Sequence, residues 1–98
     1  RNNEFMEIRI ELQENDQQKE FFLYDGDKKI GELTFSVKDG YMIINHTGVN
    51  VEYRGQGLAE KLVLKGIDYA KENNLKIRPY CSYVSNYMMK HPEYQDIL

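Results

Sequence analysis

The 98-residue sequence predicts an α+β fold in which a mixed, mostly antiparallel sheet is combined with helices in the order ββββαβα. Three observations support this prediction. Apolar and polar residues alternate in the first half of the chain, which is the period of a half-buried strand. Asp-Gly pairs at 25–26 and 39–40 are hairpin signals. After Gly57, apolar residues recur at helical spacing instead.

Four antiparallel strands are expected in the first half of the chain. The first covers 6–12 and is followed by a polar loop over 13–19. The second covers 20–24 and the third 30–37, with the two Asp-Gly turns after them. The fourth is a long strand over 41–51. Together they predict an antiparallel meander.

The second half predicts a βαβ unit and a last helix. A helix is expected from Gly57 to about Asn73, since Asn-Asn at 73–74 suits a helix C-terminus. The short segment 75–78 is expected to be a strand parallel to 41–51, which gives a right-handed crossover. Ser82 is expected to cap a short helix that runs through Lys90.

Length and composition indicate one soluble globular domain over residues 1–98, with 41% hydrophobic and 30% charged residues. Residues 1–5 precede Met6 and are a candidate cloning remnant. No apolar run has the length of a membrane span, so no membrane partner is expected. One cysteine excludes an internal disulfide and suits a cytoplasmic location. No Cys/His cluster has zinc-ligand spacing, so no metal is expected.

The net charge of −3 is unevenly distributed along the chain. Residues 1–52 carry six basic and eleven acidic side chains, whereas residues 53–90 carry seven basic and three acidic ones. The basic segment suits a small polyanionic ligand, although a solvated lysine face on a helix would give the same count. A nucleic-acid surface normally shows a stronger basic excess, so no nucleic-acid partner is expected.

The glycine-bearing turn between the fourth strand and the first helix is the leading candidate for a binding site. The segment 49–59 reads Val-Asn-Val-Glu-Tyr-Arg-Gly-Gln-Gly-Leu-Ala. The first amides of a helix lack intrahelical partners and the helix dipole favours an anion there. Gly55 and Gly57 would let a phosphate approach the backbone, and Arg54 adds a cation. The alternative is a purely structural turn.

Four further residues are candidates for catalysis. Cys81 precedes the last predicted helix, where a helix N-terminus favours thiolate, although a free cysteine is often only a small buried hydrophobe. His46 lies on the long strand, near which the segment 78–81 is expected, so it could act as a base for Cys81. Tyr83 and Tyr87 share one face of the last helix, and a phenol there could act as a general acid or simply pack.

The motif Arg54-Gly55-Gln56-Gly57-Leu58-Ala59 resembles the acyl-CoA-binding signature R/Q-x-x-G-x-G/A of the GNAT N-acetyltransferase superfamily. With His46-Thr47-x-Val49, Pro79-x-Cys81-Ser82-Tyr83-Val84 and His91-Pro92-Glu93-Tyr94, it resembles the small, roughly hundred-residue GNAT-like proteins of the YidJ type. This likeness covers about the last half of the chain.

The resemblance implies a minimal GNAT fold that binds acetyl-CoA or coenzyme A and transfers an acetyl group to an amine. Because residues 13–19 leave no room for the helices that usually build the acceptor site, a peptide or protein lying across an open groove is the candidate acceptor. The resemblance implies His46 and Cys81 as active-site candidates and favours Tyr87 as the general acid. It also implies a set of cofactor-binding residues, in which two strand residues pair with the pantetheine arm and the loop amides hold the pyrophosphate: Val49, Val51, Arg54, Gly55, Gln56, Gly57, Leu58 and Ala59.

Two departures keep other functions open. GNAT enzymes usually have two helices between the first two strands, and residues 13–19 are too few for them. No carboxylate base is evident beside the glycine turn either. The alternatives are therefore a non-catalytic acyl-CoA-binding module and a protein-interaction module. If the chain is catalytic, an amine attacks directly with His46 as base, or Cys81 takes the acetyl group first.

Overall fold

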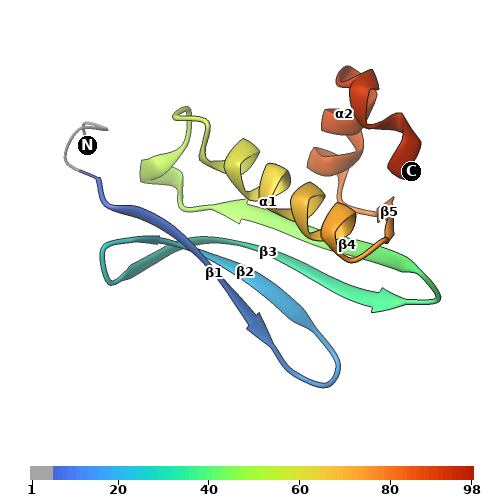
Figure 1. Ribbon diagram of the computed structural model, residues 1–98. Coiled ribbons are helices and arrows are strands. Elements are labelled where there is room, and N and C mark those ends of the chain that lie inside the picture. Colours follow the sequence, from blue (N-terminus) through green and yellow to red (C-terminus); the bar gives the residue numbers. More distant parts are fainter. Residues whose placement is uncertain (1–5) are drawn as a thin grey trace.

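The computed structural model describes residues 6–98, so the expectation for residues 1–5 lies outside the described residues. Five strands form one sheet in the order β1-β2-β3-β4-β5 (Figure 1). The first four pair antiparallel and β5 pairs parallel to β4, which confirms the predicted mixed sheet and the order ββββαβα. The strands are β1 (Ile8–Glu14), β2 (Lys19–Asp25), β3 (Lys28–Lys38), β4 (Tyr41–Val49) and β5 (Lys76–Pro79).

The first hairpin is tighter than expected. The predicted loop over 13–19 is reduced to residues 15–18, because Glu14 pairs with Lys19 and only four residues turn between them. The Asn15 side chain closes this turn by accepting hydrogen bonds from the amides of Gln17 and Gln18. The polar composition of the segment reflects its exposure as an edge hairpin, not an absence of strand.

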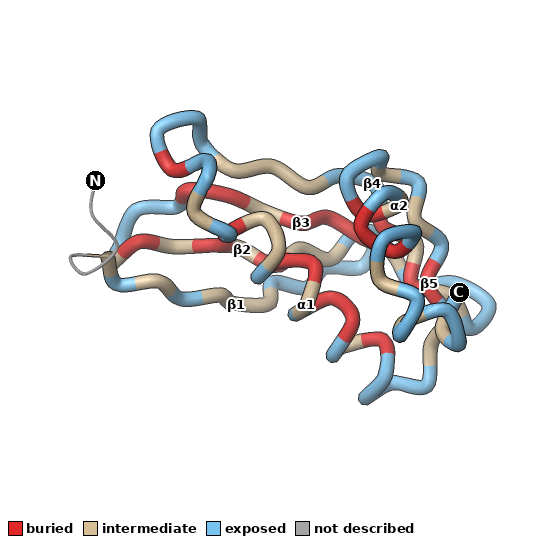
Figure 2. Tube along the Cα trace, turned by 90° about the horizontal axis from the view of Figure 1, so that it is seen from above, coloured by how far each residue is buried: buried red, intermediate tan, exposed pale blue. Residues whose placement is uncertain are grey.

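Both helices, α1 (Leu58–Glu72) and α2 (Ser82–Lys90), lie on the same face of the sheet (Figure 1). The apolar residues of α1 pack on the sheet, and Gly66 lies on the packed side, where a Cβ would be in van der Waals contact with the Met42 side chain at 3.4 Å. Buried positions follow β2, β3 and α1, whereas β1 has none (Figure 2). Within residues 6–98 the other face of the sheet carries no helix.

The α1 crossover joins the parallel strands β4 and β5, as predicted. It ends where expected, because Asn74 adopts the left-handed conformation with φ of 57°. After α2, a short 3-10 helix spans Pro92–Ile97. Within residues 6–98, neither helix has the length and the apolar run that a bilayer crossing needs.

Two predicted boundaries are wrong, and both lie next to the candidate site. The fourth strand ends at Val49 and not at Val51, because the amide of Asn50 makes the last bond to β3, to the Ile30 carbonyl at 2.7 Å. The chain then turns into a 3-10 helix, Val51–Tyr53. Ser82 is the first residue of α2, whose N-cap position is taken by Cys81.

Candidate functional site

The site begins where β4 and β5 part. Their parallel pairing covers only Tyr41–Ile44 of β4, and the last contact is the Tyr80 amide on the Ile44 carbonyl at 3.0 Å. Within residues 6–98, the remainder of β4 has no strand partner on that side, and we call residues 45–49 the free edge. Figure 1 shows β4 continuing well beyond the short β5.

A bulge in β4 decides which side chains face the helices. Thr34 pairs with His46 and Phe35 with Ile44, so Asn45 is skipped and the alternation of the strand shifts by one. Ile44 faces α1, where it lies near Gly66, and after the bulge the helix side is taken by Thr47 rather than His46. His46 and Gly48 therefore face the uncovered side of the sheet.

The backbone of the free edge offers hydrogen-bond donors. Asn50 donates its amide to β3, and successive amides of a strand point in opposite directions. The amides of Thr47 and Val49 therefore point away from β3, toward the free edge. An extended ligand arm lying along this edge could pair with β4 as another strand would.

A cavity of about 410 Å³ opens beside the free edge. The end of β4, the glycine loop, the start of α1 and the start of α2 enclose it. Its lining contains six of the eight predicted cofactor residues, two further residues of β4 and two tyrosines: Thr47, Gly48, Val49, Tyr53, Arg54, Gly55, Gly57, Leu58, Ala59 and Tyr83.

The glycine loop presents its backbone to this cavity. Gly55 and Gly57 have φ of 80° and 75°, and a Cβ at either position would meet no atom within 4 Å. The first intrahelical bond of α1 joins the Lys61 amide to the Gly57 carbonyl, so the amides of residues 58–60 have no intrahelical partner. The loop can therefore bind an anion, and a phosphate would meet no side chain at the two glycines.

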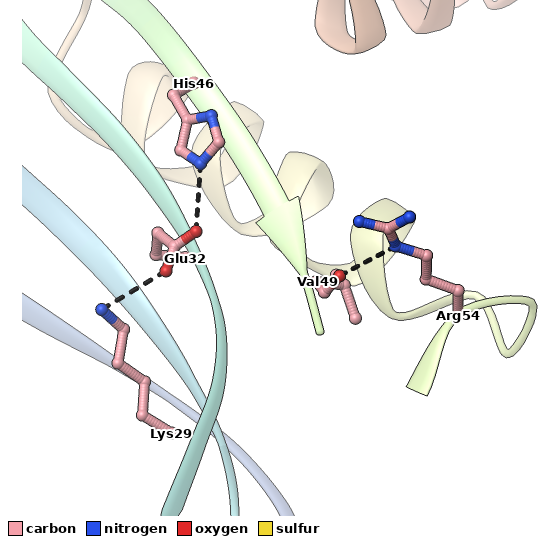
Figure 3. A network of polar contacts seen from close by, with 5 residues as sticks. All are labelled: Lys29, Glu32, His46, Val49 and Arg54. Carbon is pink, nitrogen blue, oxygen red and sulfur yellow. Dashed lines mark hydrogen bonds and ion pairs between the residues drawn. The ribbon is translucent and has the colours of Figure 1, made fainter. Parts of the chain in front are cut away.

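Arg54 is fixed by the strand that it follows. Its Nε donates to the Val49 carbonyl at 3.0 Å, which leaves the rest of the guanidinium near the loop (Figure 3). Two predicted cofactor residues do not line the cavity. Val51 lies in the 3-10 helix, where it is 72% exposed and its carbonyl accepts the Arg54 amide, and Gln56 also lies outside the lining.

The last helix presents Tyr83, not Tyr87, to the cavity. Tyr87 is 8% exposed, and its hydroxyl donates to Glu60 of α1 at 2.9 Å while its ring stacks on His91. Burial raises the pKa of Tyr87, and the hydrogen bond to Glu60 raises it further. Burial and the nearby Glu60 also raise the pKa of Tyr83, so both phenols remain protonated at neutral pH.

Cys81 lies against the free edge, as its position before α2 suggested. Burial raises the pKa of its thiol, but hydrogen bonding by the amides of Val84, Tyr83 and Thr47 and by the Thr47 hydroxyl outweighs this and lowers the pKa. The Thr47 hydroxyl oxygen is buried and, within residues 6–98, has no hydrogen-bond partner while the Cys81 thiol is neutral. It is placed to donate to the thiolate form of Cys81.

The structure does not bring His46 and Cys81 together. The Nε2 atom of His46 lies 3.0 Å from Oε2 of Glu32, on the uncovered face (Figure 3). Cys81 contacts Thr47, the next residue of β4, whose side chain points to the helix side. The expected nucleophile–base pair is therefore separated by the sheet itself.

Sequence reasoning missed three residues of this site, Thr47, Tyr53 and Glu32, and preferred Tyr87 to Tyr83. Thr47 was hidden by the bulge, because strict alternation assigns its neighbour His46 to the helix side. Tyr83 is one turn nearer the free edge than Tyr87, which a count from the start of α2 could have shown. Tyr53 of the loop and Glu32 on β3 carry no local signal, since both depend on tertiary contacts.

The chain resembles proteins of one family throughout this region. Residues 20–97 match the GCN5-related N-acetyl-transferase family. Protein NATD1 from Gallus gallus, Mus musculus and Homo sapiens is 35% identical over 49 residues. That match covers 50% of this chain and 43–44% of each relative, so the chain spans less than half the length of these relatives.

Two solved structures share the fold. A GCN5-like protein from Staphylococcus aureus, solved by NMR, has a TM-score of 0.67 at 34% identity, over 89% of this chain and 85% of that chain. A Bacillus subtilis acetyltransferase in complex with CoA has a TM-score of 0.62 at 19% identity, over 72% and 63%. The match over residues 20–97 and the shared fold agree, and the chain belongs to the GCN5-related N-acetyl-transferase family.

Proposed function

We propose that this protein is an N-acetyltransferase that binds acetyl-CoA and transfers the acetyl group to an amine. One observation carries the proposal: the free edge of β4 and the open glycine loop at the start of α1 line a single cavity of about 410 Å³. An edge that can pair with an extended arm and a loop that can bind a pyrophosphate are the two halves of a CoA site. Membership of the family supports the same function.

The residues present fit coenzyme A. The amides of residues 58–60 and the two open glycines would hold the pyrophosphate, with Arg54 beside them. The Val49 amide at the free edge would pair with the pantetheine arm or polarise the thioester carbonyl. When bound, acetyl-CoA supplies an activated thioester with an electrophilic carbonyl carbon.

The side chains around the free edge suit direct transfer. The amine nitrogen forms a bond to the carbonyl carbon, the carbon–sulfur bond breaks, and the amine loses one proton while the leaving sulfur gains one. His46 accepts the proton from the amine on the uncovered face. Tyr83, protonated and at the cavity, donates to the sulfur, a role for which Tyr87 is too firmly tied to Glu60.

Cys81 offers a second route, supported by its lowered thiol pKa. Its thiolate would take the acetyl group, forming a carbon–sulfur bond as the CoA sulfur leaves, and then pass the group to the amine. Transfer in this case begins without an amine. A second function, a non-catalytic acyl-CoA-binding module, is favoured by the four-residue turn between β1 and β2, which provides no helices to enclose an acceptor.

Two measurements test the function. Calorimetric titration with CoA and with acetyl-CoA should show binding of both, and absence of heat would overturn the proposal. Intact-mass analysis with acetyl-CoA and a panel of amines should then show an acetylated amine that requires the protein. Binding without any acetylated amine supports the binding module. A stoichiometric acetyl adduct on Cys81 before amine is added would establish the covalent route.

A further inference from the structure

Three charged or titratable side chains form a connected row on the uncovered face of the sheet. His46 Nε2 lies 3.0 Å from Glu32 Oε2, and Lys29 Nζ lies 3.3 Å from the other carboxylate oxygen (Figure 3). The ammonium of Lys29 also lies over the ring of Phe22 at 4.2 Å, which limits where it can move. Lys29 thus holds one carboxylate oxygen of Glu32, and the other oxygen faces the imidazole of His46.

The row is packed against the backbone of the candidate site. Glu32 pairs with Gly48 across the β3–β4 ladder, and Gly48 lines the cavity. A Cβ on Gly48 would lie 2.8 Å from Glu32 Oε2 and 2.9 Å from His46 Nε2. Only a glycine at this position leaves room for the contact, so the backbone of one residue separates the imidazole from the cavity.

The contact determines which imidazole nitrogen can act as a base. An ionised carboxylate only accepts hydrogen bonds, so Nε2 of a neutral His46 must carry the proton. Nδ1 then holds the free lone pair, and within residues 6–98 it has no hydrogen-bond partner. The side chain of His46 is 57% exposed, so solvent or a bound molecule can reach it.

We propose that Glu32 is the positioning residue for His46, because its hydrogen bond holds the imidazole in place and leaves Nδ1 as the free base. This inference rests on the proposed function. Nδ1 of His46 takes one proton from the ammonium form of the acceptor, and the freed lone pair forms the carbon–nitrogen bond at the thioester carbonyl carbon. As the carbon–sulfur bond breaks, Tyr83 protonates the leaving sulfur, and the second proton of the nitrogen passes through solvent to the Tyr83 phenolate. The proton of Nε2 stays in the hydrogen bond with Glu32 throughout.

The first test measures the tautomer of His46 and needs no ligand. Nitrogen-15 chemical shifts at a pH where the ring is neutral should identify Nε2 as the protonated nitrogen in the wild-type protein. The Glu32→Ala variant should move both shifts toward those of a solvent-exposed imidazole, whereas Glu11→Ala should not. Glu11 is a matched control because its pairing partner Phe22 also pairs with Glu32, which puts all three on the same face. Identical shifts in wild type and Glu32→Ala would overturn the inference.

The second test separates proton removal from the rest of the reaction. Methylamine is protonated at pH 7, like the lysine side chain with its pKa of about 10.4, whereas hydroxylamine is largely neutral there. After subtraction of the uncatalysed rates, Glu32→Ala should lower acetyl transfer to methylamine by at least about tenfold and transfer to hydroxylamine far less. Glu32→Gln keeps an oxygen that can accept from Nε2 and should restore part of the loss.

The outcomes also distinguish this inference from the proposed function. Unchanged transfer to methylamine in a folded Glu32→Ala protein would overturn the role of Glu32 while the acetyltransferase activity stands. An equal loss with both amines would also overturn it, since the variant would then have damaged the site in general. A wild-type protein that binds no CoA would overturn the function and the catalytic role together, even if the tautomer is as expected.

Discussion

The thiol of Cys81 faces four hydrogen-bond donors, and this predicts its reactivity. Amides of α2 and β4 and the Thr47 hydroxyl lower the pKa of this thiol, against the opposing effect of burial. The rate of alkylation by iodoacetamide should therefore rise with pH with a midpoint below the pKa of an ordinary cysteine. Thr47→Val should move the midpoint up. Alkylation rates across pH, followed by intact mass, give this midpoint.

His46→Ala is the control for that measurement. Since His46 contacts Glu32 on the other face, removing its ring should leave the alkylation profile unchanged. A profile that depends on His46 would contradict the structure and would restore the nucleophile–base pair that the sequence suggested.

Gly57 has a left-handed backbone conformation, and it has no side chain on the side that faces the cavity. Its φ of 75° strains any other residue, and a side chain there would enter the space that we assign to the pyrophosphate. Gly57→Val should weaken CoA binding more than tenfold, or by more than about 1.4 kcal/mol, as measured by calorimetry. Arg54→Ala should weaken CoA binding less than Gly57→Val does, because salt screens an exposed contact between charges.

Gly40 provides the matched control for Gly57. It has φ of 83°, and a Cβ at this position would also meet no atom within 4 Å, but it lies in the β3–β4 hairpin and does not line the cavity. Gly40→Val should therefore lower the melting temperature through the same backbone strain and leave CoA affinity intact. Equal affinities of the two variants for CoA would exclude the glycine loop as the phosphate site.

At the level of elements, the sequence predicted most of the fold because the local signals were strong. Alternation located β1 to β4, Asp-Gly placed the β2–β3 and β3–β4 hairpins, and the left-handed Asn74 ended α1 near the expected residue. The glycine loop was also located correctly between β4 and α1. These features depend on residues close together in the chain, and a pattern in the sequence can report them.

The positions of the candidate catalytic residues were harder to predict because they depend on the bulge at Asn45. A bulge is set by pairing with β3, and skipping one residue exchanges the faces of His46 and Thr47. The early end of β4 likewise depends on the bond from Asn50 to Ile30. Neither contact leaves a local pattern, so His46 was expected to lie near Cys81.

The packing of α2 on α1 predicts different roles for two tyrosines one turn apart. Tyr87→Phe leaves the Glu60 carboxylate without its 2.9 Å donor in a partly buried position, so it should destabilise the protein by about 1–3 kcal/mol. Catalytic turnover in the folded variant should stay close to wild type. Tyr83→Phe should have little effect on stability, because Tyr83 is 41% exposed, but should lower turnover.

Chemical denaturation and steady-state kinetics on the two variants check this assignment. The reverse pattern, with normal turnover in Tyr83→Phe and a large loss in folded Tyr87→Phe, would return the general-acid role to Tyr87.

For the molecule as a whole, the sheet lies between the proposed cofactor site and the face from which we propose that the acceptor approaches. The glycine loop, the free edge and α2 enclose a cavity on the helix side of the sheet, whereas the opposite face carries no helix within residues 6–98. The turn between β1 and β2 is too short to add one there. A face without helices beside the free edge suits an acceptor group presented by a peptide or a protein.

This separation predicts how the whole domain responds to its ligand. CoA would contact four elements that line the cavity: β4, the glycine loop, α1 and α2. Because these elements are brought together only by folding, CoA would bind the folded state and not the unfolded chain. At a free CoA concentration one hundred times the dissociation constant, linkage stabilises the fold by about 2.7 kcal/mol. For a domain of this size each kcal/mol raises the melting temperature by about 4–8 °C, so an increase of at least about 10 °C is expected. Differential scanning calorimetry with and without CoA measures it, and Gly57→Val at the same CoA concentration should show a much smaller increase. A wild-type melting temperature that CoA does not change would mean that the cavity does not bind this ligand in the folded state.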